Sequence, residues 1–273
     1  LKAQDIERVA LEFAARRPAV AAFTNRGSQA HYNGLNNDRA VILLNAIVGS
    51  IGRPGGYCYG ELEKLDTVVF PPPEPQPPAA TTRTDLEDPP EWPIANRWQK
   101  MKVGQIVFDY VKQGRGKVQV YISYTLGAPM TWPEGRSLAV EVMSDESLIP
   151  LHVCSDVVYS EQAHYADIIL PDATYLERWG LDIRNNLELR PYVLMRQPMT
   201  PPPGQAKSFA DSLFDIGRRL RPEQAKYFQF GTHEDFVKAQ CAKIPKGDYA
   251  SGFERMKAHG VYTDTSLPKG YEI

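Results

Sequence analysis

The chain has 273 residues, with 31 basic and 33 acidic side chains and a formal net charge of -2. A balance this close to neutral excludes a general polyanion-binding field, so nucleic acid is not an expected partner. No apolar run of about 18 residues occurs, which predicts no direct membrane insertion, and no signal peptide is visible. A chain of this length can bury a core as one large or two ordinary domains.

The three cysteines, Cys58, Cys154 and Cys241, are widely spaced along the chain. Because they include no C-x-x-C pair, the sequence predicts neither a zinc ribbon nor an iron–sulfur cluster within these residues. Cys154 falls in a predicted buried strand and is interpreted as a small apolar residue.

The first quarter of the chain predicts two helices and a short strand. Residues 4–17 place apolar side chains on one helical face, and an apolar strand is expected over 19–24. A polar, glycine-bounded loop follows over 25–34. The helix predicted over 38–51 is apolar almost all round, so we expect it inside the molecule. The glycine-rich turn 52–56 ends it.

Residues 61–98 have a different composition, with nine prolines and little periodicity. We interpret this segment as an extended, irregular arm, since it is too long for an ordinary connection. Regular structure is expected to resume with a helix over 97–113 and a strand over 118–123. A loop over 124–135 and a helix over 136–143 follow.

The most informative stretch predicts a strand over 148–153, a short amphipathic helix, and a second strand over 167–171. Short apolar runs of this kind suit buried parallel strands in a βαβ unit. In open α/β sheets, ligands bind outside the carboxyl ends of the strands. Asp156 and the turn 171–174 are therefore the first candidates for function, although Asp156 is equally typical of a helix N-cap.

The last third predicts an edge strand over 187–197 interrupted by Pro191, helices over 208–220 and 233–244, and a polar tail. The expected fold is α/β, with an open, mostly parallel, Rossmann-like sheet covered by helices on both faces, and a long proline-rich arm. The expected domains are an α/β segment, the proline-rich arm, a dinucleotide-binding α/β domain and a short helix with an irregular tail that leads to a missing domain, over residues 1–60, 61–98, 99–225 and 226–273.

Several familiar catalytic motifs are absent. Glu161 and His164 have the spacing of a helical metal pair, but no second copy exists, and a solvated helix face is the preferred interpretation. Ser28 follows a predicted strand but lacks the second glycine of a hydrolase elbow. Gly27 and Gly34 are wrongly spaced for a G-x-G-x-x-G fingerprint. What remains is a series of strand ends followed by polar loops, suited to an elongated polar ligand.

Three blocks, taken together, resemble a known family. They read P-A-V-A-A-F-T-N-R-G-S-Q-A-H-Y-N-G followed by R-A-V-I-L-L-N-A-I-V-G-S-I-G-R-P-G-G, then Y-I-S-Y-T-L-G-A-P-M-T-W-P, then S-D-V-V-Y-S-E-Q-A-H-Y-A-D-I-I-L-P-D-A-T-Y-L-E-R-W-G. They are similar to the central part of catalytic subunits of the dimethyl-sulfoxide-reductase family. The T-Y-L-E-R-W-G and R-Q-P-M segments most resemble the branch that reduces tetrathionate, thiosulfate, polysulfide or arsenate.

The resemblance implies a molybdenum or tungsten oxidoreductase of anaerobic respiration, with the metal on two molybdopterin guanine dinucleotides. It also implies a 4Fe-4S cluster in an amino-terminal part outside this sequence. The implied partners are a membrane-anchor subunit plus an iron–sulfur electron-transfer subunit. The expected location is the periplasm or cell envelope, with the cytoplasm as the alternative.

Other functions stay open beside this one. They are a formate-dehydrogenase-like enzyme of the same family and a non-catalytic α/β docking module. The isolated chain is expected to hold no cofactor and to be inactive.

The resemblance also assigns cofactor-binding roles to individual residues. Gly27, Ser28 and Gln29 match a loop that approaches one pterin, and Gly55 and Gly56 match a turn that runs past the metal.

Three further residues match contacts on the nucleotide side of the cofactor. Thr131 matches a phosphate or ribose contact, Asp156 matches the acid that binds guanosine, and Asp211 matches a second guanine-side acid. A carboxylate can accept two parallel hydrogen bonds from guanine or from ribose hydroxyls. His31 and Tyr32 either face the substrate funnel or pack against the following helix.

Overall fold

The computed structural model describes residues 2–24, 26–58, 107–132, 135–185, 191–220 and 222–263. The chain divides into two compact units. The first comprises Leu1–Thr67, Leu181–Met195 and Cys241–Ile273, and the second Val68–Gly180 and Arg196–Gln240. In the described ranges no helix is long and apolar enough to cross a membrane. The predicted arm over 61–98 lies outside them.

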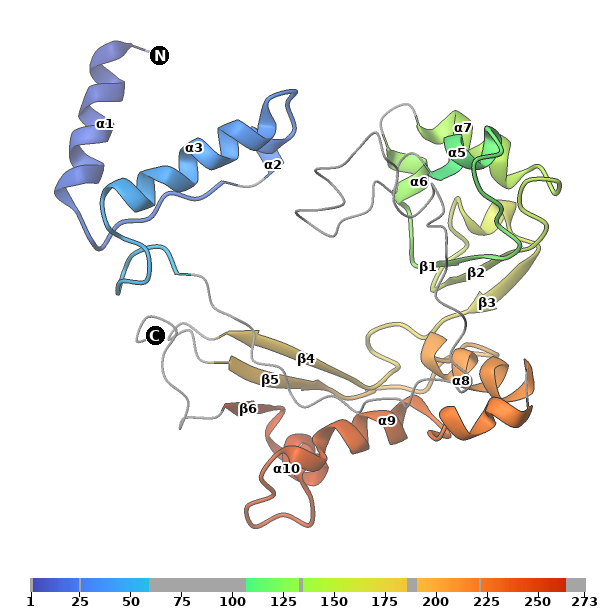
Figure 1. Ribbon diagram of the computed structural model, residues 1–273. Coiled ribbons are helices and arrows are strands. Elements are labelled where there is room, and N and C mark those ends of the chain that lie inside the picture. Colours follow the sequence, from blue (N-terminus) through green and yellow to red (C-terminus); the bar gives the residue numbers. More distant parts are fainter. Residues whose placement is uncertain are drawn as a thin grey trace. The chain divides into compact units, whose positions relative to one another are not determined.

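The first unit begins with three helices, α1 (Ala3–Ala15), α2 (Arg26–Gln29) and α3 (Gly34–Ile47) (Figure 1). Both long helices were expected from their periodicity, but the interior position predicted for α3 is wrong. Its side chains Leu43 and Ile47 are 54% and 78% exposed, and α1 has no buried residue among those described. An all-round apolar helix needs neighbours on every side, and the described residues supply them on one side only.

The strand predicted over 19–24 does not form, although the segment is held in place. Asn45, a fully buried residue of α3, performs this task through its side-chain amide. Its Oδ1 accepts a hydrogen bond from the backbone N–H of Ala22 at 2.8 Å. Its Nδ2 donates to the backbone carbonyl of Ala22 at 2.7 Å. A side chain therefore replaces the strand partner that the sequence pattern had predicted.

Replacing Asn45 tests this interpretation. We expect Asn45→Ala to destabilise the first unit by about 1–3 kcal/mol, because it leaves two backbone groups of Ala22 without their partner. Amide hydrogen exchange at Ala22 should speed up relative to the α3 amides. Asn37→Ala is the control, since its side chain makes one exposed bond to the carbonyl of Ser28. Equal protection of the Ala22 amide in both variants would show that the Asn45 side chain does not hold this segment in place.

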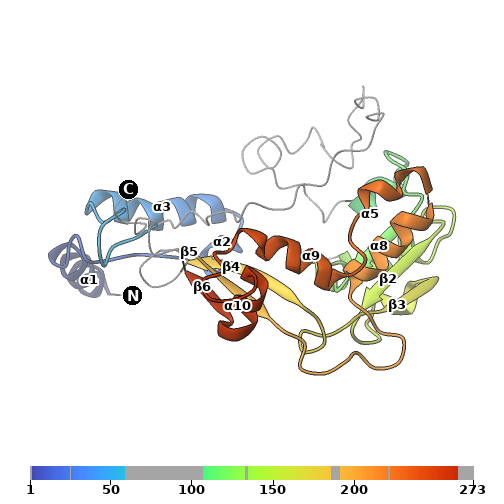
Figure 2. The ribbon, with the colours of Figure 1, turned by 90° about the horizontal axis from the view of Figure 1, so that it is seen from below.

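A second part of the first unit is built on residues 181–195 of strands β4 (Gly180–Asn185) and β5 (Pro191–Arg196) and on β6 (Val261–Thr263), while Gly180 and Arg196 belong to the second unit. The strands form a three-stranded sheet in this order, and the two views agree in showing them side by side with α10 (Gly252–His259) next to β6 (Figures 1 and 2; Figure 2 is the turned view). β5 runs antiparallel to β6, with Val193 opposite Tyr262.

This region holds two errors of the sequence analysis. β5 begins at Pro191, a residue that cannot donate to a ladder, and residues 187–190 of the predicted strand lie outside the described residues. β4 was not predicted, and the supposed irregular tail contains α10 and β6. Ser251 caps α10 by accepting a bond from the N–H of Glu254 at 3.2 Å, and Gly260 ends it with φ of 71°, so the tail carried recognisable helix signals.

The second unit contains the predicted parallel sheet, with β1 (Tyr121–Tyr124), β2 (His152–Asp156) and β3 (Ile168–Pro171) in that order. Both pairs are parallel, with Tyr121 opposite His152 and Val153 opposite Ile168. The strand expected over 148–153 starts later, because Pro150 lacks the N–H that a central strand needs.

Helices cover one face of this sheet. They are α5 (Val107–Lys112), α6 (Ala128–Thr131) and α7 (Gly135–Met143), and the core between them contains Phe108, Val111, Met130, Ala139, Val142, Met143 and Ile149. The 3-10 turn η2 (Ala163–Tyr165) joins β2 to β3. The unit continues with α8 (Phe209–Leu220), η3 (Pro222–Tyr227) and α9 (His233–Gln240), and the 3-10 turn η4 (Cys241–Lys243) follows.

The opposite face of the sheet stays open among the described residues. Ile122 and Ile168, which share this face through the register with Val153, are 48% and 46% exposed. The architecture is therefore mixed α/β with open sheets, and the expected cover of helices is present on one face of the parallel sheet. The domain boundaries predicted above remain a prediction.

Candidate functional site

The carboxyl ends of β1, β2 and β3 meet at one edge of the second unit. Tyr124 ends β1 and Asp156 ends β2, while Asp172 directly follows β3. The ladder continues past the strands, since Asp172 N–H donates to the carbonyl of Asp156 at 3.0 Å and Thr125 N–H to that of Ser155 at 3.0 Å. Polar groups from three strands therefore gather where ligands bind in open α/β sheets.

Asp156 presents a carboxylate that the protein uses only in part. Its Oδ1 accepts a bond from the N–H of Val157 at 2.8 Å, and among the described residues none donates to Oδ2. The interpretation as a helix N-cap is wrong, because the N-cap of the 3-10 turn that follows is Gln162, and the Asp156 carboxylate accepts from the adjacent N–H of Val157 instead. Beside this carboxylate the side chains of Val158 and Tyr159 are exposed.

Asp172 is the opposite case, a carboxylate fully engaged inside the unit. Its side chain is 0% exposed and pairs with Arg178, whose side chain is 13% exposed, at 3.2 Å. Its Oδ1 accepts a bond from the N–H of Phe209, the first residue of α8, at 2.8 Å. Arg178 also donates to the hydroxyl of Tyr124. This ion pair ties the ends of β1 and β3 to the start of α8.

Two further contacts complete the junction with α8. The rings of Tyr124 and Phe209 stack at 4.4 Å with 16° between their planes. Asp211, two residues on, accepts a bond from the backbone N–H of His233 at the start of α9. The hydroxyl of Ser208 lies 3.1 Å from Nδ1 of the same histidine. α8 and α9 are thus fixed at the carboxyl edge of the sheet.

The pKa of His233 is shifted by burial and by the charged residues around it. Burial lowers the pKa of its imidazole below the ordinary value of 6.5, and the charges of Arg178 and Arg196 lower it further. The carboxylates of Asp211 and Asp172 oppose this shift. The imidazole is therefore neutral at pH 7 and adds no charge to the edge.

The other residues predicted for the nucleotide side occupy the same part of the unit. Thr131 ends α6, and its exposed hydroxyl lies 3.2 Å from the carbonyl of Ala128 in its own helix. Gly127, at the start of this helix, has open space where a side chain would be. Asp211 lies near the edge through α8, but its carboxylate already holds α9. Thr131, Asp156 and Asp211 thus belong to one unit, with Asp156 the most available.

The residues predicted for the pterin side lie in the first unit, at the two ends of α3. α2, which carries Gly27, Ser28 and Gln29, packs at its start, where Asn37 donates to the carbonyl of Ser28. The turn with Gly55 and Gly56 follows its end. Since a 14-residue helix is about 20 Å long, the structure does not bring these two groups together within the unit.

The individual pterin-side residues differ in how tightly they are built in. A side chain at Gly56 would overlap the carbonyl oxygen of Ser50, so only glycine fits there, whereas Gly27 is surrounded by open space. His31 and Tyr32 are exposed, and Tyr32 does not pack against α3 as one interpretation expected.

The metal pair suggested by spacing is not formed. Glu161 pairs with Arg136 at 3.0 Å, and Nδ1 of His164 lies 3.3 Å from the hydroxyl of Tyr159. Across the described ranges, no group of three or more His, Cys, Asp or Glu side chains is placed to hold a metal ion. Cys154 is buried in β2, as its interpretation as an apolar residue predicted.

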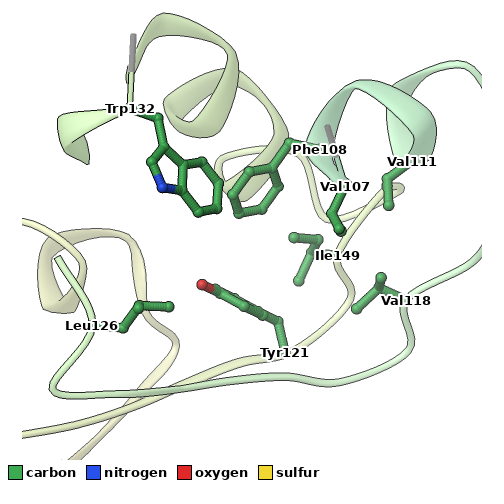
Figure 3. Close-up of a pocket in the computed structure, with 8 residues that line it drawn as sticks. All are labelled: Val107, Phe108, Val111, Val118, Tyr121, Leu126, Trp132 and Ile149. Carbon is green, nitrogen blue, oxygen red and sulfur yellow. The ribbon is translucent and has the colours of Figure 1, made fainter. Parts of the chain in front are cut away.

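An apolar pocket of about 160 Å³ lies between α5, β1 and the end of α6. Figure 3 shows Phe108 and Trp132 reaching toward Tyr121, which lies opposite them. Phe108 packs edge-on against Tyr121 at 5.8 Å. Because its walls are apolar and continuous with the hydrophobic core, this pocket does not suit a polar dinucleotide. The candidate site is therefore the carboxyl edge of the sheet.

Sequence reasoning missed the internal support of this edge. Asp172 was singled out with its turn, but its partners Arg178 and Phe209 were not. Arg178 lies six residues after Asp172 and Phe209 lies 37 residues after it, while Tyr124, which accepts from Arg178, is 54 residues from that arginine. A local pattern could therefore have suggested the ion pair, whereas the stack and the contact to α9 required the fold.

The chain is similar to molybdopterin enzymes of known families. A family model described as molybdopterin oxidoreductase matches residues 17–219. A sulfite dehydrogenase subunit of Allochromatium vinosum is 28% identical over 237 residues, which cover 74% of this chain and 24% of that protein. The thiosulfate reductase molybdopterin-containing subunit PhsA of Salmonella typhimurium is 28% identical over 229 residues, covering 79% and 29%. Dimethyl sulfoxide reductase DmsA of Escherichia coli is 23% identical over 283 residues, covering 99% and 33%.

The chain spans about a quarter to a third of the length of these relatives. The family match covers well over half of the chain, including both glycine segments of the first unit and the whole carboxyl edge of the parallel sheet. The chain therefore belongs to the molybdopterin oxidoreductase family, as part of a catalytic subunit.

Proposed function

We propose that the chain is the central part of a molybdenum or tungsten oxidoreductase that reduces a sulfur or arsenic oxyanion. Its role in that enzyme is to bind molybdopterin guanine dinucleotide. When bound, the metal and its pterins supply the redox chemistry, and the protein supplies position and electrostatics.

The observation that carries this proposal is the half-used carboxylate of Asp156 at the carboxyl edge of the parallel sheet. One oxygen is oriented by the N–H of Val157, and no donor among the described residues occupies the other, which we propose accepts from the ligand. A carboxylate of this kind can accept hydrogen bonds from the N–H groups of guanine or from ribose hydroxyls. Tyr159, three residues on along the chain, is exposed and has its ring edge-on to His164.

The residues of the second unit fit the nucleotide end of such a cofactor. Asp156 would hold the guanosine, and the exposed hydroxyl of Thr131 would contact ribose or phosphate. The open space beside Gly127 leaves room for the backbone to approach a phosphate. We propose that Gly27, Ser28, Gln29, Gly55 and Gly56, which lie in the first unit, contact a pterin in the complete enzyme.

The substrate class rests on sequence likeness. The T-Y-L-E-R-W-G and R-Q-P-M segments support the branch that acts on tetrathionate, thiosulfate, polysulfide or arsenate. Two of the relatives above carry names that refer to sulfur oxyanions, sulfite and thiosulfate. We further propose a 4Fe-4S cluster elsewhere in the enzyme, with a periplasmic location for the whole. Its partners would be a membrane-anchor subunit plus an iron–sulfur electron-transfer subunit.

Exposed apolar surface supports membership of a larger assembly. α1 buries none of its described residues, α3 exposes Leu43 and Ile47, and one face of the parallel sheet exposes Ile122 and Ile168. Exposed apolar side chains that gather on the face of a helix or sheet are typical of an interaction site. We propose that other segments of the complete catalytic subunit cover these surfaces.

The test is Asp156→Asn in the complete enzyme. Asparagine keeps an oxygen that accepts from the N–H of Val157, so the melting temperature of the 273-residue chain should stay nearly unchanged. It removes the charge from the cofactor contact, which is worth roughly 1.5–3 kcal/mol. We therefore expect dinucleotide affinity to fall about tenfold to a hundredfold, measured as guanine nucleotide released per chain.

Asp109→Asn is the matched control, because it removes the same charge from α5 while keeping an acceptor for the side chain of Gln113. It should retain the full nucleotide content. Full occupancy in Asp156→Asn would remove Asp156 from the binding site and favour the docking-module alternative.

A further inference from the structure

A pair of arginines lies beside one exposed aromatic ring in the second unit. The guanidinium carbon of Arg196 is 4.5 Å from the ring centroid of Tyr175. That of Arg178 is 5.4 Å from the same centroid. The tyrosine is 66% exposed, so solvent reaches this cluster. Two cations at one ring repel each other unless an anion lies near them.

Glycine at the start of β4 makes this arrangement possible. Gly180 begins β4 and Arg196 ends β5, and a side chain on Gly180 would overlap Nη2 of Arg196. The guanidinium of Arg196 therefore occupies the space that any other residue at position 180 would fill. Its position is built into the pairing of β4 with β5.

The two arginines differ in how their charge is balanced. Arg178 pairs with the buried Asp172 and donates to Tyr124. Arg196 makes no ion pair and donates no side-chain hydrogen bond to any residue in the described part of the chain. The Nε atoms of both arginines are buried without an acceptor among those residues. A buried donor without an acceptor is costly, and an unplaced ion is one of its accepted explanations.

Among the described residues, the cluster therefore carries one positive charge without a counter-ion. Asp172 neutralises Arg178, and His233, whose pKa burial holds below its ordinary value, stays neutral at pH 7. A guanidinium presents its N–H groups as a planar fork that matches two oxygens of a phosphate-like or sulfonate-like group. The chemistry required of a ligand is thus a small tetrahedral oxyanion.

We propose that Arg196, with Arg178 and Tyr175, forms a binding site for a small tetrahedral oxyanion. The oxyanion is either a free inorganic ion or the phosphate of a nucleotide, and both use the same recognition. This inference does not depend on the function proposed above, which rests on Asp156. Arg178 mainly supports the fold through Asp172, so Arg196 is the residue to vary.

The test is calorimetric titration of the 273-residue chain with inorganic phosphate, thiosulfate and GDP at low ionic strength. The unsubstituted chain should bind one oxyanion. Arg196→Gln should weaken binding about tenfold to a hundredfold, the value of a charge-assisted hydrogen bond. Gly180→Ala should weaken it as well, because the added methyl group displaces the guanidinium without removing its charge.

The control is Arg136→Gln, which removes a positive charge from an exposed pair with Glu161 in the same unit and should leave affinity unchanged. Circular dichroism of each variant confirms folding. Binding of phosphate and thiosulfate identifies a free ion as the ligand, and binding of GDP alone that is weakened by Arg196→Gln identifies a phosphate ester. No binding of any of the three, or equal losses in Arg136→Gln and Arg196→Gln, would overturn the proposal.

Discussion

Asp172→Ala is expected to lower the unfolding free energy of the second unit by about 3–5 kcal/mol, the cost of breaking a buried ion pair by removing one partner. The substitution leaves the guanidinium of Arg178 without its counter-ion inside the unit. It also removes the acceptor for the N–H of Phe209, which starts α8. Urea denaturation followed by tryptophan fluorescence should show a midpoint shifted to much lower urea concentration.

Two comparisons separate the contributions at this position. Asp172→Asn retains an oxygen for the N–H of Phe209 but loses the charge, so it should destabilise the unit less than Asp172→Ala does. Asp215→Asn breaks the exposed contacts to Arg218 and Lys207, and surface pairs contribute little to stability. If Asp172→Ala shifted the midpoint no further than Asp215→Asn, the buried pair would not hold β1, β3 and α8 together.

The elements that sequence alone predicted well are those with a complete local signal. α1, α7, α8 and α9 show a one-sided apolar period, and each forms within a few residues of its predicted bounds. The strands β2 and β3 were expected as a parallel pair because short apolar runs ended at polar residues. Local pattern was sufficient here because the signal lies within each element, and α1 forms in this way although it has no buried residue among those described.

The failures have a common physical cause, which is the dependence on a distant partner. The segment 19–24 has the composition of a strand, but Asn45 offers its backbone a side-chain amide instead of a ladder. The tail that forms α10 and β6 is polar, and it is ordered by pairing with β5 and by Ser251 and Gly260 at the helix ends. The composition of α3 favours a buried helix, whereas the described residues leave its Leu43 and Ile47 side chains exposed.

The candidate site shows the same division. Asp156 could be found because it ends an apolar run, and ligands bind at strand ends in such sheets. The ion pair of Asp172 with Arg178 and the stack of Tyr124 on Phe209 depend on bringing β1, β3 and α8 together. Residues proposed to touch a ligand were thus partly visible in the sequence, whereas those that fix its surroundings became visible only in the fold.

Acid should destabilise the second unit before any carboxylate titrates. His152 is fully buried in β2, with Nε2 3.0 Å from the hydroxyl of Ser123 and Nδ1 3.1 Å from the carbonyl of Tyr165. Burial lowers the pKa of its imidazole, while the Tyr165 carbonyl and the charge of Asp167 oppose the shift. The folded chain therefore holds this histidine neutral at a pH where the unfolded chain protonates it.

The sign of the effect follows from proton binding. The unfolded chain takes up a proton at His152 near its ordinary pKa of about 6.5, and the folded chain does so only at lower pH. The contribution of His152 to the free energy of unfolding is thus fully present above about pH 6.5. It falls as the pH drops below this value, by up to about 1.4 kcal/mol per pH unit, until the pKa of His152 in the folded chain is reached. His233, whose pKa is also lowered, acts in the same direction.

Urea midpoints of the unsubstituted chain measured from about pH 8 to about pH 5 should therefore decline steadily. His152→Gln removes the titrating group and retains a polar side chain opposite Ser123, so it should be less stable at the alkaline end yet decline less toward the acidic end. His31→Gln, which changes an exposed histidine of the first unit, should follow the unsubstituted chain at every pH. Asp215, whose pKa is lowered from 3.8 to about 2 by Lys207 and Arg218, contributes its loss only below about pH 4. Parallel declines for His152→Gln and the unsubstituted chain would show that the acid sensitivity arises elsewhere than at β2.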